Sequence, residues 1–257
     1  MHILRPLTVA LGLLAAWQAL VWLTHVPWYI LPGPGRVFAA WFAEYELILG
    51  HAGVTLVEIL IGLALGTLFG ALAAIVVGHW RGARLWLLPL LVASQAIPVF
   101  ALAPILMLWL GYGMASKVAM ATLIIFFPVT ASFLDGLRRT EAGWLDLART
   151  MTAGHARGRW AELRHIRIPA ALPALASGLR VATAVAPIGA VVGEWVGSSA
   201  GLGYLMLHAI ARVKTDLAFA ALFTLAIFVV ALYFAMDRGL RHLVPWQREA
   251  LADERGV

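Results

Sequence analysis

A serine and a histidine in the last third of this 257-residue chain have the types and spacing of a nucleophile and its base. Gly-Ser-Ser-Ala-Gly at 197–201 matches the G-x-S-x-G pattern, with Ser199 at its centre and His208 nearby. That chemistry requires a strand-to-helix turn, an acid and an oxyanion hole, whereas this motif follows a long apolar segment. We therefore expect a flexible turn here, and an intramembrane serine hydrolase using Ser199 and His208 is the alternative.

The sequence indicates neither a metal site nor a nucleotide site. His155 and His165 are ten residues apart, which is not a metal-ligand spacing on one helix, and the chain has no cysteine. Its two lysines, Lys117 and Lys214, lie outside any G-x-x-x-x-G-K-[ST] motif. We predict that this chain binds no cofactor or metal. Any ATP-driven function would need ATP and Mg on another polypeptide.

Composition determines the class of protein that must position these residues. The chain is 62% hydrophobic and 12% charged, which is too apolar for a soluble domain. The apolar runs are rich in Leu and Ala and lack the alternation of a membrane barrel, so helices are the expected spans. The net charge of +6 resides in short loops beside these runs, which is typical of topology signals and not of nucleic-acid binding. We predict an all-α polytopic membrane protein with a single domain over 1–257.

About six spans are predicted, with both termini in the cytoplasm. Fourteen of the 19 basic residues lie on the side of the termini, four lie on the other side, and Arg180 falls within a span. The third apolar run is interrupted by Ser94, Gln95, Pro98 and Pro104. Such a break is either a part of a transport pathway or ordinary proline kinking. The predicted spans are 7–23, 55–77, 85–110, 118–137, 174–196 and 217–236.

The second predicted span has a ridge of small residues. Gly62, Gly66 and Gly70 recur every four residues, a spacing that allows another helix to approach closely. The neighbour is expected to be a helix of the same bundle, and a dimer seam is the alternative. Glu58 lies near the outer end of this span, where exposure at the membrane interface is expected.

A charged stretch over 138–173 stands out from the apolar chain, with seven arginines, two histidines and three acids. Two apolar sets repeat every three or four residues, Leu145-Ala148-Met151 and Trp160-Leu163-Ile166. The pattern predicts two short amphipathic helices around a glycine-containing turn (Gly154, Gly158), ending at Pro169. Such a segment favours a partner-docking surface; the alternative is a solvated arginine loop that serves only topology. A polar tail is expected over about 237–257.

Several segments resemble a known family. Asp146-Leu147-Ala148 and Ile166-Arg167-Ile168-Pro169 correspond to the two ends of the motif E-A-A, three residues, G, nine residues, I-x-L-P, although the stretch is four residues longer. LPGPGRVFAAW, PVFALAPILMLWLGYGMASKV and AALPALASGLRVATAV match the family as well. The chain thus resembles the membrane subunit of bacterial ATP-binding-cassette (ABC) importers of the sulfonate, taurine and nitrate type. Segment 186–222 is most similar to permeases for thiamine-precursor pyrimidines or riboflavin.

The resemblance implies a type I importer permease in the bacterial inner membrane, a transport subunit and not an enzyme. It implies a second copy of the permease, a cytoplasmic ATPase that binds the coupling loop, and an extracytoplasmic substrate-binding protein. Leu147, Ala148, Met151 and Trp160 would fill a groove on the ATPase, with Arg149, Arg157 and Arg159 at its rim. The predicted coupling residues are Asp146, Leu147, Ala148, Arg149, Met151, Gly154, Arg157, Gly158, Arg159, Trp160 and Pro169.

The transported solute is expected to be a pyrimidine or riboflavin-like heterocycle, with sulfonate, taurine or nitrate-like anions as the alternative. Residues predicted to line the pathway are Ser94, Gln95, Thr183 and Glu194. A membrane anchor for a regulatory complex is a further alternative, and it would show no solute flux.

Overall fold

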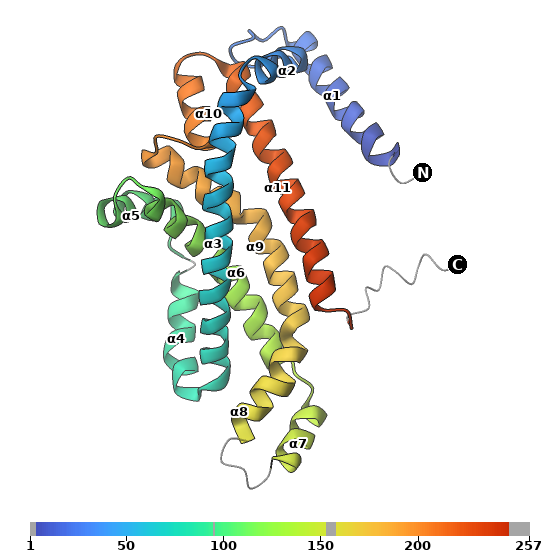
Figure 1. Ribbon diagram of the computed structural model, residues 1–257, viewed down its shortest axis with the longest axis vertical. Coiled ribbons are helices and arrows are strands. Elements are labelled where there is room, and N and C mark those ends of the chain that lie inside the picture. The colour runs from blue at the N-terminus through green and yellow to red at the C-terminus, as the bar shows by residue number, and fades with distance from the viewer. Residues whose placement is uncertain (1–3, 95, 153–157, 247–257) are drawn as a thin grey trace. The chain divides into compact units, whose positions relative to one another are not determined.

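The computed structural model describes residues 4–94, 96–152 and 158–246, and this part of the chain is helical without a strand (Figure 1). The all-α architecture expected from composition is therefore confirmed. In chain order the helices are α1 (Leu4–Thr24), α2 (Pro34–Ala43), α3 (Tyr45–His79), α4 (Arg81–Ser94), the 3₁₀ turn η1 (Val99–Leu102), α5 (Ala103–Leu110), α6 (Met114–Arg138), α7 (Ala142–Met151), α8 (Gly158–Glu162), the π-helical turn η2 (Leu163–Arg167), α9 (Ile168–Gly197), α10 (Leu202–Ala211) and α11 (Thr215–Leu243).

Four helical segments among the described residues are long and apolar enough to cross a bilayer. They are α3 with 35 residues, α6 with 25, the continuous segment from α8 to the end of α9 with 40, and α11 with 29. A helix satisfies its own backbone hydrogen bonds, so these segments can lie in hydrocarbon without water. The polytopic membrane fold is thus confirmed. The first predicted span coincides with α1, which has 21 residues.

The third predicted span is wrong as a single helix, although the predicted interruption is present. Helix α4 ends at Ser94, Pro98 precedes η1, and Pro104 lies in the first turn of α5, where its missing N–H costs no hydrogen bond. The 14 residues of α4 are about 21 Å long at ~1.5 Å per residue, less than the ~30 Å core of a bilayer. Gln95 lies outside the described residues.

The predicted helix end at Pro169 is also wrong. Pro169 is the second residue of α9, and the helix continues to Gly197 with Pro173 and Pro187 in its interior. The π-helical turn η2 lies directly before Pro169, and the N–H of Ile168 bonds to the carbonyl of Leu163. Such a widened turn gives room for the proline ring, which in a regular helix collides with the carbonyl four residues earlier.

The chain divides into two compact units. The first comprises Met1–Val57 and Glu194–Phe228, and the second Glu58–Gly193 and Val229–Val257, so that α3, α9 and α11 each contribute to both. In the first unit, aromatic side chains join the elements. Trp17 of α1 stacks on Phe219 of α11 with ring centroids 6.1 Å apart, and Trp41 Nε1 of α2 donates to Thr224 Oγ1 of α11 at 3.0 Å.

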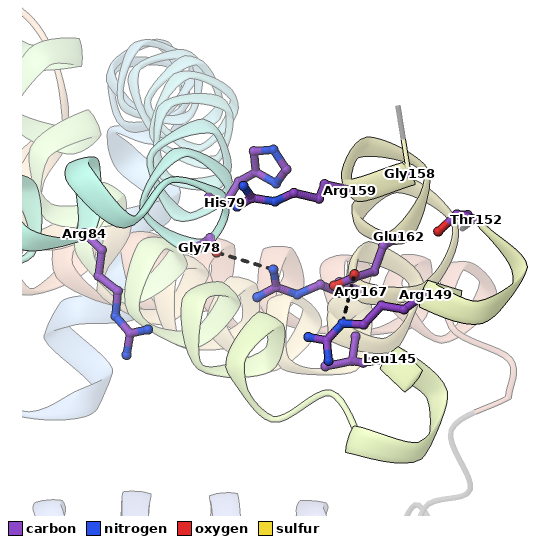
Figure 2. Close-up of a pocket in the computed structure, with 10 residues that line it drawn as sticks. All are labelled: Gly78, His79, Arg84, Leu145, Arg149, Thr152, Gly158, Arg159, Glu162 and Arg167. Carbon is purple, nitrogen blue, oxygen red and sulfur yellow. Dashed lines mark hydrogen bonds and ion pairs between the residues drawn. The ribbon is translucent and has the colours of Figure 1, made fainter. Parts of the chain in front are cut away.

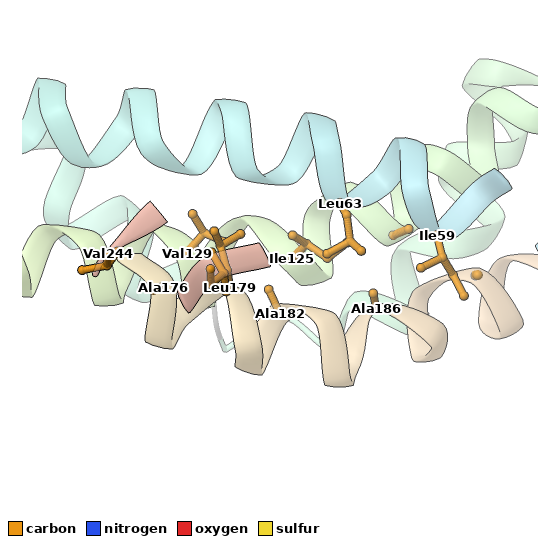
Figure 3. Close-up of a cluster of buried hydrophobic side chains, with 12 residues drawn as sticks. Ile59, Leu63, Ile125, Val129, Ala176, Leu179, Ala182, Ala186 and Val244 are labelled. Carbon is orange, nitrogen blue, oxygen red and sulfur yellow. The ribbon is translucent and has the colours of Figure 1, made fainter. Parts of the chain in front are cut away.

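The core of the second unit forms where α3, α6 and α9 pack against one another. Ile59 and Leu63 of α3 lie over Ile125 of α6 and over Ala182 and Ala186 of α9 (Figure 3). These residues are at most 4% exposed. Small side chains on α9 allow the large ones on α3 and α6 to fill the space between the helices.

The glycine ridge of α3 lies against α6 of the same chain. A Cβ added to Gly62 would lie 2.5 Å from Ala121 Cβ, and one added to Gly66 would lie 2.6 Å from Ile125 Cγ2. A Cβ added to Gly70 would lie 2.9 Å from the Phe126 carbonyl oxygen. Glycine is needed at these positions because any side chain would force the two backbones apart.

A buried ion pair joins α3 and α6 in the second unit. Lys117 Nζ is 2.8 Å from Glu58 Oε1, and the two side chains are 7% and 0% exposed. The expectation that Glu58 is exposed at the membrane interface is therefore wrong. Lys117 lies in the first turn of α6 and not in a loop, which places a compensating charge beside the carboxylate.

Candidate functional site

Helix α7 lies within the charged stretch and has two apolar faces, one buried and one exposed. Ala148 is 3% exposed and Leu145 is half-buried, so this face packs against the chain's own second unit. Trp144, Leu147 and Met151 are 58%, 60% and 74% exposed. The predicted face Leu145-Ala148-Met151 is thus corrected: Leu145 and Ala148 are turned inward, while Met151 belongs to the outward face with Trp144, which the sequence reasoning did not include.

Charged side chains hold α7 beside α8. Arg149 Nη1 donates to Asp146 Oδ1 at 3.1 Å within α7, and Arg149 Nε lies 3.9 Å from Glu162 Oε2 of α8. Arg149 and Asp146 are 65% and 71% exposed at their side chains, so water screens this pair. Both remain accessible to an oppositely charged partner.

Two arginines of the charged stretch bind the carboxyl ends of the long helices (Figure 2). Arg167 donates from Nε and Nη2 to the Leu137 carbonyl at 3.3 and 3.0 Å, and from Nη1 to the Gly78 carbonyl at 3.4 Å. Arg159 Nη2 donates to the His79 carbonyl at 3.4 Å. The last carbonyls of a helix have no partner within it and carry partial negative charge, so a guanidinium satisfies them well.

These bonds connect the charged stretch mechanically to α3 and α6. Arg159, which is predicted to lie at the rim of a partner's groove, bonds to the His79 carbonyl of its own chain. The Trp160 ring lies edge-on to His79 with centroids 6.0 Å apart. Arg167 was not predicted as a site residue. Its role depends on where two distant helices end in space, and no sequence pattern reports that.

Of the other predicted residues of the coupling loop, two lie in helices and two are not described. Gly158 begins α8 and packs on Thr152, whose Oγ1 would lie 3.0 Å from an added Cβ, and Pro169 lies in α9. Gly154 and Arg157 lie outside the described residues.

A cavity of about 900 Å³ lies between the end of α3, the start of α4 and the charged stretch. We call it the basic cavity, since four arginines and one glutamate contribute to its wall. It is lined by Gly78, His79, Arg84, Leu145, Arg149, Thr152, Gly158, Arg159, Glu162 and Arg167 (Figure 2).

Two of the predicted pathway residues, Thr183 and Glu194, are buried. Thr183 is 0% exposed and donates from Oγ1 to the Leu179 carbonyl of its own helix. Glu194 is 1% exposed and is bound by its own unit. Ser94 is the last residue of α4, and Gln95 is not described. That these four residues line a transport pathway stays a prediction.

Glu194 organises the turn between α9 and α10. It accepts hydrogen bonds from Thr55 Oγ1 at 2.6 Å and from the backbone N–H groups of Gly203 and Tyr204 at the start of α10. A carboxylate is well placed there because the first N–H groups of a helix lack internal partners. Gly201 has φ +117°, and a Cβ on it would collide with the Glu194 carboxyl group.

This geometry explains the Gly-Ser-Ser-Ala-Gly motif without catalysis. Ser199 lies between two helices, whereas the nucleophile elbow requires a strand before the serine. His208 Nδ1 lies 3.2 Å from the Tyr204 carbonyl, one turn earlier in α10. The serine-hydrolase alternative receives no support from this arrangement.

Fold and site together define a helical membrane protein with an extramembrane segment whose apolar face is open to a partner. Residues 66–249 match the family model of the binding-protein-dependent transport system inner membrane component. The chain belongs to this family, and the resemblance to ABC importer permeases is confirmed.

Three relatives align over nearly the whole chain. A protein of Haemophilus influenzae named "Probable ABC transporter permease protein" is 54% identical, covering 95% of this chain and 98% of the relative. The formylaminopyrimidine transport permease protein ThiX of Halalkalibacterium halodurans is 35% identical, covering 96% and 97%. The riboflavin transport system permease protein RibX of Chloroflexus aurantiacus is 38% identical, covering 94% and 89%.

A solved structure has the same fold. A chain of the MetNI methionine ABC transporter, in inward-facing conformation, superposes with a TM-score of 0.66 at 19% identity, covering 78% of this chain and 97% of that chain. The protein is thus a multi-pass inner membrane permease subunit of an ABC importer with a type I fold. It is a transport component, and its family depends on a separate binding protein.

Proposed function

We propose that α7 is the coupling helix of this permease and that its outward face seats on the ATPase subunit. The observation that carries the proposal is the exposure of Trp144, Leu147 and Met151 at 58%, 60% and 74%. These residues follow one another at helical spacing on a segment that carries many charges. Burying each in a groove would contribute about 1–2 kcal/mol, given ~25 cal/mol per Å² of apolar surface.

The contacts of Arg159 and Arg167 connect the charged stretch to the ends of the long apolar helices α3 and α6. A displacement of the charged stretch would pull on the ends of α3 and α6 through Arg159 and Arg167, which bond the carbonyls of His79, Gly78 and Leu137. ATP and Mg would be bound by the partner subunit. In this arrangement closure of the ATPase moves the inner ends of two spans.

The proposed orientation places the charged stretch and both termini in the cytoplasm, where the ATPase resides. The arginine-rich composition of this stretch supports it, since positively charged loops remain inside. We propose further that two copies of the permease pair to form the translocation pathway. Mass measurement of the purified chain by light scattering in detergent tests the pairing, and a monomeric mass would contradict it.

The proposed cargo is a flat nitrogen heterocycle of the pyrimidine or riboflavin type. Support comes from two relatives that are named for such solutes and align over more than nine-tenths of this chain. Cells lacking the chain should lose uptake of labelled formylaminopyrimidine or riboflavin. Loss of taurine, alkanesulfonate or nitrate uptake with retained heterocycle uptake would overturn the substrate class in favour of an anion permease.

The coupling proposal is tested by a charge placed on the outward face. Leu147→Glu should abolish uptake and copurification of the ATPase, because the partner would have to bury an unpaired carboxylate. Ala142→Glu is the matched control: Ala142 is also exposed, but it lies in the first turn on the opposite side of α7. Equal uptake in the two variants would contradict the assignment of the face.

A further inference from the structure

The basic cavity has an excess of positive charge that the described protein groups do not neutralise. Arg84, Arg149, Arg159 and Arg167 contribute four charges to its wall and Glu162 contributes one of the opposite sign, a formal balance of +3 for the lining residues. Including Asp146, which pairs with Arg149, leaves a balance of +2. Like charges around one cavity repel, and the repulsion is stronger beside a membrane than in bulk water. An anion in the cavity would relieve it.

The arginines differ in how many N–H groups remain free. Arg167 directs three donor atoms to backbone carbonyls and Arg159 directs one. The Arg84 side chain makes no hydrogen bond or ion pair with any residue the structure describes, and Arg149 engages only an exposed aspartate and a glutamate at 3.9 Å. Figure 2 shows Arg84 on α4 on one side of the cavity and Arg149 on the other. Among the described residues, the whole Arg84 guanidinium and the Nη2 group of Arg149 thus have no hydrogen-bond partner.

The neighbouring residues have the composition of a membrane surface. Helix α3 ends at His79 and α4 begins at Arg81, with Trp80 between them at 56% exposure. Leu85 and Trp86, directly after Arg84, are 74% and 79% exposed. Exposed tryptophans beside arginines at the ends of apolar helices are typical of the headgroup level of a bilayer. An apolar chain attached to an anion in the cavity could therefore continue along α4.

We propose that the basic cavity binds the phosphate headgroup of an anionic phospholipid, with Arg84 and Arg149 as its main ligands. Basic pockets between membrane helices at this level have the chemistry for such headgroups, and guanidinium forks bind phosphate oxygens in pairs. A volume of about 900 Å³ is ample for a glycerophosphate group. The inner-leaflet location rests on the orientation proposed above, whereas binding itself does not depend on it.

The test is a lipid titration of the purified full-length chain in detergent, followed by its melting temperature. Short-chain phosphatidylglycerol should raise the melting temperature at far lower concentration than phosphatidylcholine with the same acyl chains. Arg84→Gln should weaken the apparent affinity for phosphatidylglycerol about fivefold, which corresponds to the loss of one arginine–headgroup interaction. The double variant Arg84→Gln with Arg149→Gln loses two such interactions and should weaken the affinity about thirtyfold. Arg84→Gln removes no described internal contact, so the fold should survive.

Arg164→Gln is the matched control, because Arg164 is exposed on η2 and does not line the cavity. Equal responses to the two lipids, or an equal loss in Arg164→Gln, would overturn the proposal. Inorganic phosphate is the second ligand to be titrated. If millimolar phosphate competes with phosphatidylglycerol, the result supports a phosphate subsite in the cavity. Binding of phosphate without any response to phosphatidylglycerol would overturn the lipid in favour of a free anion. Loss of lipid binding when the ATPase is present would assign the cavity to the ATPase instead.

Discussion

The buried pair of Glu58 and Lys117 should dominate the stability of the second unit. Lys117 Nζ lies 2.8 Å from Glu58 Oε1 with less than a tenth of either side chain exposed. Removing one partner leaves a charge without its counterion in a low-dielectric interior, which costs about 3–5 kcal/mol. We expect Glu58→Met and Lys117→Met each to lower the free energy of unfolding by about that amount.

The double variant should recover most of the loss, because two packed apolar side chains leave no buried charge. Replacing a whole buried ion pair is often close to neutral, so the coupling energy of the cycle should exceed about 2 kcal/mol. Equilibrium unfolding of the purified chain in mixed detergent micelles measures all four proteins.

An exposed pair in the same chain is the control for this cycle. Lys214 Nζ lies 3.7 Å from Glu44 Oε1, with the side chains 57% and 41% exposed, and its coupling should stay below about 1 kcal/mol. A coupling energy of the buried pair no larger than that of the exposed pair would show that burial does not determine the strength of this interaction.

Three further predictions concern the packing of the helices and the coupling route. Gly66→Ala should lower the free energy of unfolding by about 1–3 kcal/mol, because its Cβ would lie 2.6 Å from a side chain of α6. Gly53→Ala on the same helix is the control: its Cβ meets nothing within 4 Å, so the variant should be neutral or stabilising. Thermal unfolding of the two variants measures the difference. Gly201→Ala should destabilise more than Gly111→Ala, since both have positive φ but only the first collides with a buried carboxylate. Arg167→Gln should keep ATPase binding yet reduce uptake at least tenfold; unchanged uptake would disprove a mechanical link through its carbonyl bonds.

The composition and periodicity of the sequence were sufficient to predict the class of protein and most of the helices. Apolar runs long enough to cross a bilayer predict helices, because hydrocarbon offers the backbone no other hydrogen-bond partners. The charged stretch was also evident, since seven arginines beside such runs must remain in water. The prediction that a helix ends at Pro169 was wrong because the π-helical turn before it makes room for the ring. Leu163, the first residue of that turn, packs in one cluster with Leu137 of α6, a contact that no local pattern reports.

An all-α membrane permease with one charged, amphipathic segment could thus be predicted from the amino-acid sequence. The folded structure was needed to show which face of α7 is exposed, which arginines bind the ends of α3 and α6, and that Glu58 pairs with Lys117 in the interior. The physical reason is the same in each case. Composition and periodicity describe a helix and its faces, whereas burial, ion pairing and capping depend on which distant segment lies beside it.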